Sequence, residues 1–101
     1  MACKIIYKAS ANQDLQEITE YLFEYSAQAT VKFLKDVKSR IEILAAMPKA
    51  GSQISPFHNY RKMVVGDYVI VYLFDKHSED VVIFRIVHGR RNYITEPPFK
   101  N

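Results

Sequence analysis

The chain has 101 residues, of which 49% are hydrophobic and 25% charged, and its formal net charge is +3. This length supports one domain with a real core and is too short for two. The apolar fraction excludes an intrinsically disordered chain, and the single cysteine, Cys3, excludes a disulfide framework or a cysteine-based zinc site. No apolar run approaches the roughly 18 residues that a membrane span needs, and the first residues are too short an apolar stretch for a signal peptide. We therefore expect a single domain over residues 1–101, located in the cytoplasm and not bound to a membrane.

The whole net charge lies in the second half of the chain. Residues 1–47 carry six basic and six acidic side chains, whereas residues 48–101 carry eight basic and five acidic ones. A positive field of this size can steer a protein toward an anionic partner. A basic surface kept for solubility explains the same numbers equally well.

The first elements are predicted to be a short strand and an acidic helix. Residues 3–8 are rich in strand-forming types. Ser10 and Gln13 have the spacing of a capping box, in which two side chains satisfy the free N–H groups of a starting helix. Apolar residues then recur at helical spacing while acidic ones cover the other side, which predicts a helix over residues 11–25. The apolar positions are Leu15, Ile18, Leu22 and Tyr25.

A second helix is predicted between Ser26, a suitable cap, and Pro48, which cannot continue a helix. Its apolar residues step by three, four and three, so they share one face. These residues are Leu34, Val37, Ile41 and Leu44. Because almost no linker separates the two helices, we expect an antiparallel helical hairpin.

After a polar loop over residues 48–59, the periodicity becomes extended. Residues 60–65 and 68–74 read as strands joined by Gly66 and Asp67, a strong two-residue hairpin signal, and residues 81–87 form the last strand. The order β-α-α-β-β-β predicts an α+β domain, a helical hairpin followed by a three-stranded antiparallel sheet. We expect the first strand to join that sheet as a fourth, beside the C-terminal strands. The expected core is Ile5, Leu15, Ile18, Leu22, Leu34, Val37, Ile41, Leu44, Val71 and Ile86.

Arg85 interrupts the otherwise apolar last strand. Side chains alternate along a strand, so we expect Arg85 to share a face with Ile83 and Val87. A permanently charged guanidinium there needs a carboxylate, a carbonyl or a polyanionic ligand. The structural alternative is an ion pair with an acidic group such as those on the first helix. The functional alternative is a contact with an anion on an exposed sheet face.

A basic and aromatic cluster follows directly, in residues 88–93. Guanidinium groups such as those of Arg90 and Arg91 bind phosphates or carboxylates bidentately, and Tyr93 is able to stack on a base. His88 is able to act as an acid or base near neutral pH. The three histidines lack metal-ligand spacing, and the three glycines lie too far apart for a phosphate loop. We therefore expect no metal and no cofactor.

At this point the chain resembles the RelE/ParE superfamily of bacterial type II toxin–antitoxin toxins, over roughly residues 5–93. The last block is the most specific, because Arg85, His88, Gly89 and Arg91 resemble the ending of the ParE branch. The other matching residues are Asp14, Leu15, Ile18, Tyr21, Leu22, Ala29, Phe33, Leu44, Pro48, Gly51 and the run 60–72.

The resemblance implies a growth-inhibiting, plasmid-stabilising toxin that a cognate antitoxin neutralises with a helix laid on the toxin surface. ParE-like members poison DNA gyrase, whereas RelE-like members cut messenger RNA in the ribosome without metal. Where the nuclease branch places arginines on the hairpin strands, this chain has Val64 and Val69. Losing those cations removes the electrostatic stabilisation that phosphoryl transfer requires, so we favour the ParE branch.

Two alternatives stay open: a ribosome-dependent nuclease that uses His88 and Arg91 as catalytic groups, and an inactive remnant that only binds an antitoxin. For a gyrase poison, we expect no catalytic residues. The candidate target- or nucleic-acid-binding residues are Arg61, Lys62, Arg85, His88, Arg90, Arg91 and Tyr93.

Overall fold

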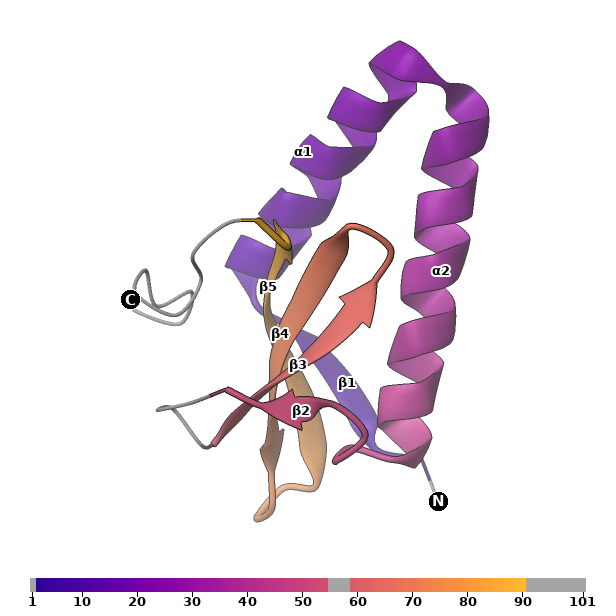
Figure 1. Ribbon diagram of the computed structural model, residues 1–101. Helices are drawn as coiled ribbons and strands as arrows, with labels where there is room; N and C mark the ends of the chain where they lie inside the picture. Colours follow the sequence, from indigo (N-terminus) through magenta and orange to yellow (C-terminus); the bar gives the residue numbers. More distant parts are fainter. Residues whose placement is uncertain (1, 55–58, 91–101) are drawn as a thin grey trace.

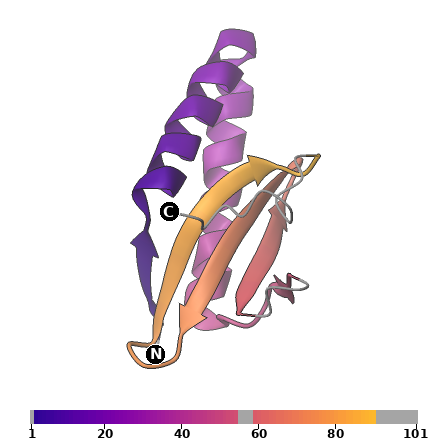
Figure 2. The ribbon, with the colours of Figure 1, turned by 90° about the vertical axis from the view of Figure 1, so that its left-hand side faces the viewer.

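The computed structural model describes residues 2–54 and 59–90 of the chain. Its elements are β1 (Lys4–Tyr7), α1 (Ala9–Tyr25), α2 (Ala27–Ala46), β2 (Ser52–Gln53), β3 (Tyr60–Val65), β4 (Tyr68–Asp75) and β5 (Asp80–His88). The two helices form a hairpin that lies on one side of the sheet (Figures 1 and 2). The α+β class is therefore confirmed. No helix in the described part of the chain is long and apolar enough to cross a membrane.

The sheet has five strands in the order β1-β5-β4-β3-β2. β1 runs parallel to β5, and the other pairs are antiparallel. The expected place of the first strand beside the last is thus confirmed. The expected strand number is too low, because β2 pairs with β3 through only two residues, and a segment that short leaves no alternating pattern in the sequence.

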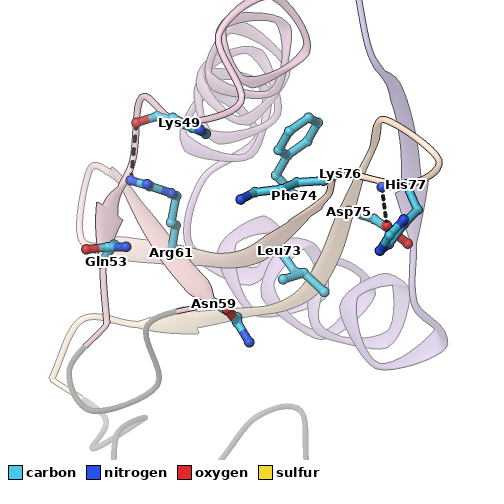
Figure 3. Close-up of a pocket in the computed structure, with 9 residues that line it drawn as sticks. All are labelled: Lys49, Gln53, Asn59, Arg61, Leu73, Phe74, Asp75, Lys76 and His77. Atoms are coloured by element: carbon cyan, nitrogen blue, oxygen red, sulfur yellow. Dashed lines mark hydrogen bonds between the residues drawn. The ribbon is translucent and has the colours of Figure 1, made fainter.

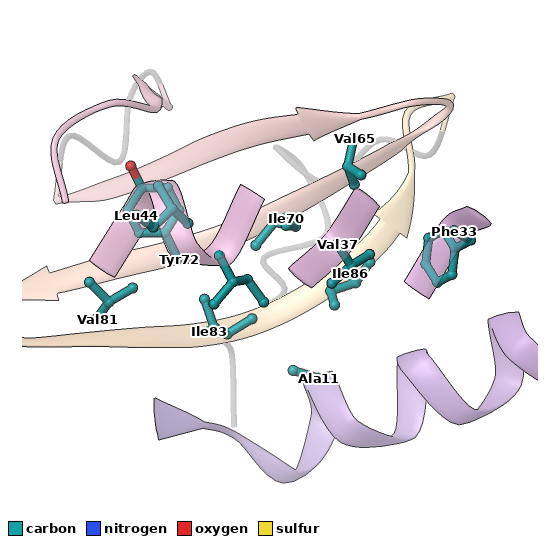
Figure 4. Close-up of a cluster of buried hydrophobic side chains, with 11 residues drawn as sticks. Ala11, Phe33, Val37, Leu44, Val65, Ile70, Tyr72, Val81, Ile83 and Ile86 are labelled. Carbon is teal, nitrogen blue, oxygen red and sulfur yellow. The ribbon is translucent and has the colours of Figure 1, made fainter. Parts of the chain in front are cut away.

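The core lies between the helical hairpin and one face of the sheet (Figure 4). A smaller cluster of Ile54, Val69, Val71 and Val87 lies apart from it and includes alternate residues of β4, as the alternation of side chains in a strand requires. Nine of the ten expected core residues are buried or pack partly buried against these clusters.

The tenth expected core residue, Leu34, was wrongly assigned. Its side chain is 44% exposed, and the neighbouring Phe33 is buried instead, at 7% exposure. The inward stripe of α2 is Phe33, Val37, Ile41 and Leu44. Phe33 extends this stripe by one helical turn, whereas Leu34 lies about 100° around the helix from Phe33. The spacing of three between Leu34 and Val37 is compatible with a shared face, but the Phe33 side chain occupies the core position next to Val37.

The two helix starts differ in how they are capped. Ser26 caps α2 as expected, because its Oγ accepts a hydrogen bond from the Ala29 amide at 3.1 Å. The predicted capping box on α1 is wrong. The N-cap of α1 is Lys8, with no side-chain cap, and Ser10 lies inside the first turn, where its Oγ donates to the Phe84 carbonyl at 2.6 Å.

A bulge in β5 changes which side chains share a face. Val71 lies opposite Arg85 while the next residue, Tyr72, lies opposite Ile83, so Phe84 is the extra residue of a β-bulge. As a consequence, Ile83 belongs to the helix-side core and Val87 to the smaller cluster. The expectation that both share a face with Arg85 is therefore wrong, because simple alternation fails at a bulge.

Candidate functional site

Beyond the end of β1, side chains of α1 bind the backbone groups at the edge of β5. β1 pairs with β5 only as far as Ile83, and the Lys8 amide continues this ladder by donating to the Ile83 carbonyl at 2.9 Å. Beyond that point Ser10 binds the Phe84 carbonyl, and Asp14 accepts a hydrogen bond from the Ile86 amide at 2.9 Å. An unprotected strand edge is a template for unwanted pairing. Here the first turns of α1 supply the missing partners.

Asp14 also binds the guanidinium of Arg85. The Arg85 Nε and Nη2 atoms donate to the two carboxylate oxygens at 2.6 and 3.0 Å. The two side chains are 21% and 10% exposed, Arg85 being the more exposed one. This confirms the structural alternative for Arg85, an ion pair with the first helix. The ion pair of Arg85 with Asp14 therefore links β5 to α1.

His88 and Arg90 lie exposed at the end of β5, where Tyr68 is the partner of His88 across the strands. The His88 ring meets the Tyr68 ring edge-on, with centroids 5.4 Å apart, and its Nδ1 accepts a hydrogen bond from the Arg90 amide at 3.2 Å. Partial burial raises the pKa of Tyr68. Of the candidate cluster, Arg91 and Tyr93 lie outside the described residues.

Arg61 lies toward the other end of the sheet, opposite Tyr72. Its Nη1 donates to the carbonyls of Gly51 and Lys49 at 2.7 and 3.3 Å. The Tyr72 hydroxyl accepts from the Gly51 amide and donates to the Pro48 carbonyl, both at 2.8 Å, and burial raises the pKa of that hydroxyl. These bonds fasten the segment after α2 to the sheet. They also explain Gly51, because a Cβ atom there would lie 2.5 Å from the Lys62 carbonyl oxygen and 2.6 Å from the Tyr72 hydroxyl.

A depression of about 570 Å³ opens beside Arg61. Cationic side chains reach it from three segments: Lys49 after α2, Arg61 on β3, and Lys76 in the turn between β4 and β5, which also contributes His77 (Figure 3). Of these cations, only Arg61 is among the candidate residues predicted from the sequence. Lys49 and Lys76 are 27 residues apart in the chain and share no motif, so only the pairing of the strands brings them to one depression.

The valines on the hairpin strands lie directly opposite one another. Val64 on β3 pairs with Val69 on β4, and they are 56% and 5% exposed. Val69 packs in the smaller apolar cluster with Val71 and Val87. The sheet thus presents hydrocarbon, and no charge, at this pair. Among the described residues, no three His, Cys, Asp or Glu side chains are grouped so as to hold a metal ion.

The protein-family model described as the ParE toxin of the type II toxin–antitoxin system, parDE, matches the sequence over residues 5–93. The chain belongs to the ParE toxin family. No match is found among curated protein sequences. Among solved structures, the fold of this chain is similar to that of chains in two toxin–antitoxin structures and one free toxin, from three bacteria.

The chromosomal ParDE system of P. aeruginosa matches with a TM-score of 0.70 at 14% identity, covering 86% of this chain and 96% of that one. The RelBE2 complex of Mycobacterium tuberculosis matches at 0.62 and 20% identity, covering 87% and 99%. A double mutant of the E. coli toxin RelE in the free state matches at 0.68 and 10% identity, covering 95% and 93%. At these identities the likeness shows a shared fold.

In this ParE-family toxin the described candidate residues do not form one site. Arg61 lies opposite Tyr72 and His88 opposite Tyr68 on the same strand, and four residues of strand span about 13 Å. Lys62 lies between them, opposite Val71. The candidates therefore divide into a group near Arg61, a group at the end of β5, and Arg85 in its ion pair.

Proposed function

We propose that this toxin inhibits DNA gyrase. The observation that carries the proposal is the pair of Val64 and Val69, which fills with apolar side chains the part of the sheet where the resemblance places the cations of the nuclease branch. Arg85 adds support, because its guanidinium is held by Asp14. Cleavage of RNA by a metal-free protein needs preorganised cations around the reacting phosphate, and valines supply none. Family membership points in the same direction.

The same proposal includes neutralisation by a cognate antitoxin that lays an amphipathic helix between the helical hairpin and the turn between β3 and β4. A hollow of about 170 Å³ lies there, with the half-buried Leu22 and the core residues Phe33 and Val65 at its floor. The ion pair of Lys32 and Asp36 lies at its rim. Apolar floors with charged rims are what amphipathic helices bind. Two of the solved relatives are themselves complexes of a toxin with an antitoxin or antitoxin peptide.

One specific observation keeps a ribosome-dependent nuclease as the second candidate. His88 is exposed at the end of β5, next to Arg90, so its imidazole is accessible to an RNA substrate. Histidine is the side chain used most often as a general acid or base in enzymes. In such a nuclease His88 would be the acid or base, and Arg91 would stabilise the phosphate.

The test is a gyrase supercoiling assay and a ribosome-dependent messenger cleavage assay on one preparation of the full-length chain. We expect inhibited supercoiling and intact messenger. The variant His88→Ala should weaken inhibition only partly, and Lys38→Ala, which removes an exposed side chain of α2, should leave it unchanged. Codon-dependent cutting that is lost in His88→Ala but kept in Lys38→Ala would overturn the proposal, because removing a general acid or base costs about 100- to 10,000-fold in rate. Inactivity in both assays, with antitoxin binding retained, would overturn it in favour of the inactive remnant.

A further inference from the structure

The depression beside Arg61, called here the basic depression, carries an excess of positive charge from separate parts of the fold. Lys49, Arg61 and Lys76 line it, and Asp75 is the one carboxylate among the described residues of its lining. The Oδ1 atom of Asp75 accepts a hydrogen bond from the His77 amide at 2.9 Å and a longer one, 3.5 Å, from the Ser78 amide. The His77 bond is the main reason that the pKa of Asp75 lies below its ordinary value. Asp75 thus stabilises its own turn.

Arg61 is the fixed cation of the basic depression. Its Nη1 is anchored by the carbonyls of Gly51 and Lys49. Within residues 2–54 and 59–90, the hydrogen bonds of this side chain are made by Nη1, and the guanidinium lines the depression. A guanidinium matches the geometry of phosphate oxygens and keeps its charge at every physiological pH. Lys49 and Lys76 are exposed, and a lysine ammonium on its four-carbon stem is able to adjust to an anion that Arg61 orients.

The rest of the lining suits the other parts of a nucleotide. Leu73 and Phe74, whose side chains lie on opposite sides of β4 (Figure 3), each add apolar surface, and the amide side chain of Asn59 adds a donor and an acceptor of the kind that read base edges. The depression lies where β4 runs on for two residues beyond its last pairing with β3, the pair of Tyr60 and Leu73. Its volume of about 570 Å³ is within the range of small-ligand sites.

From these residues we propose that the basic depression binds a nucleotide unit of a single-stranded nucleic acid, with the phosphate held by Arg61, Lys49 and Lys76. An acidic peptide would satisfy the cations but would leave the Asn59 amide and the apolar surface of the depression without a specific partner. A duplex presents its phosphates on a convex surface, whereas this pocket is concave. The proposed site is separate from the end of β5, and it does not depend on which enzyme the toxin inhibits.

The test is fluorescence anisotropy of the full-length chain with labelled single-stranded DNA and RNA 12-mers over a series of salt concentrations. Lys49→Gln/Lys76→Gln removes two cations without touching the Lys49 carbonyl that anchors Arg61. We expect this variant to bind about tenfold more weakly, with the slope of log affinity against log salt reduced by about 1.4, or about 0.7 for each lost phosphate contact. The matched control Lys35→Gln/Lys38→Gln removes two exposed lysines of α2 and should bind like the unmodified chain.

A comparison of the two oligonucleotides identifies the source of the phosphate, since a stronger response of RNA indicates contacts with the 2′-hydroxyl. Equal loss in both double variants would overturn the proposal, because it would show diffuse attraction by net charge. Loss in Arg90→Gln with none in Lys49→Gln/Lys76→Gln would also overturn it and move binding to the end of β5. Binding of a polyglutamate peptide under conditions in which neither oligonucleotide binds would overturn the proposal in favour of an acidic protein partner.

Discussion

Replacing Asp14 by alanine tests whether the closed edge of β5 holds the fold together. The substitution leaves the Arg85 guanidinium without its carboxylate and the Ile86 amide without its acceptor. Removing one partner of a buried ion pair costs about 3–5 kcal/mol. Because Arg85 is 21% exposed, water recovers part of that, and we expect a loss of about 2–4 kcal/mol of unfolding free energy. Asp14→Asn keeps an oxygen for the Ile86 amide and should cost about half as much.

The assay is urea unfolding followed by circular dichroism, with thermal unfolding as a second measurement. For a chain of this length, 3 kcal/mol corresponds to a fall in Tm of about 12–24 °C. The control is Asp36→Asn, which breaks the ion pair with Lys32, whose side chains are 44% and 77% exposed. Exposed pairs contribute at most about 1 kcal/mol. A loss of stability in Asp14→Ala no larger than that in Asp36→Asn would show that the contacts of Asp14 do not hold the fold together.

Three further substitutions test the packing. Gly51→Ala should destabilise by about 3 kcal/mol in urea unfolding, because its Cβ would meet the Lys62 carbonyl oxygen at 2.5 Å; an unchanged midpoint would contradict the close approach. Phe33→Ala should cost about 3–5 kcal/mol and Leu34→Ala less than about 1 kcal/mol, and the reverse order would restore Leu34 to the core. Tyr72→Phe should cost about 1–3 kcal/mol at pH 8 by orphaning the Gly51 amide. Because the raised pKa of Tyr72 favours its neutral form in the folded state, that difference should shrink as the pH rises above 10, the ordinary value, through the folded pKa; a constant difference up to pH 11 would argue against the buried hydroxyl.

The features predicted well from the sequence are those with local causes. The two helices follow from their apolar periodicity, and the hairpin from Gly66, which has the positive φ of 60° that its turn requires. Ser26 acts as the cap that its type and position indicate. In each of these cases the residues that decide the structure are close in sequence to the structure they form.

Apart from the exchange of Leu34 for the adjacent Phe33, the missed features depend on residues that are distant in sequence. Ser10 has the spacing of a capping residue, but its hydroxyl binds the Phe84 carbonyl, 74 residues away. The bulge at Phe84 is set by pairing with β4 and has no sequence signal of its own. The basic depression was missed for the same reason, because Lys49 and Lys76 come to line one depression only through the pairing of β3, β4 and β5. Arg85 is the exception, because a charged side chain in an apolar strand needs a partner, and an acidic side chain of the first helix was one of the two expected partners.

The most direct test of the central claim is gyrase supercoiling measured against increasing amounts of the purified full-length chain, with and without its antitoxin. We predict concentration-dependent loss of supercoiling that an equimolar amount of antitoxin restores, while ribosome-bound messenger in a parallel reaction stays intact. Full supercoiling at every toxin concentration, together with cut messenger, would contradict the assignment to gyrase inhibition.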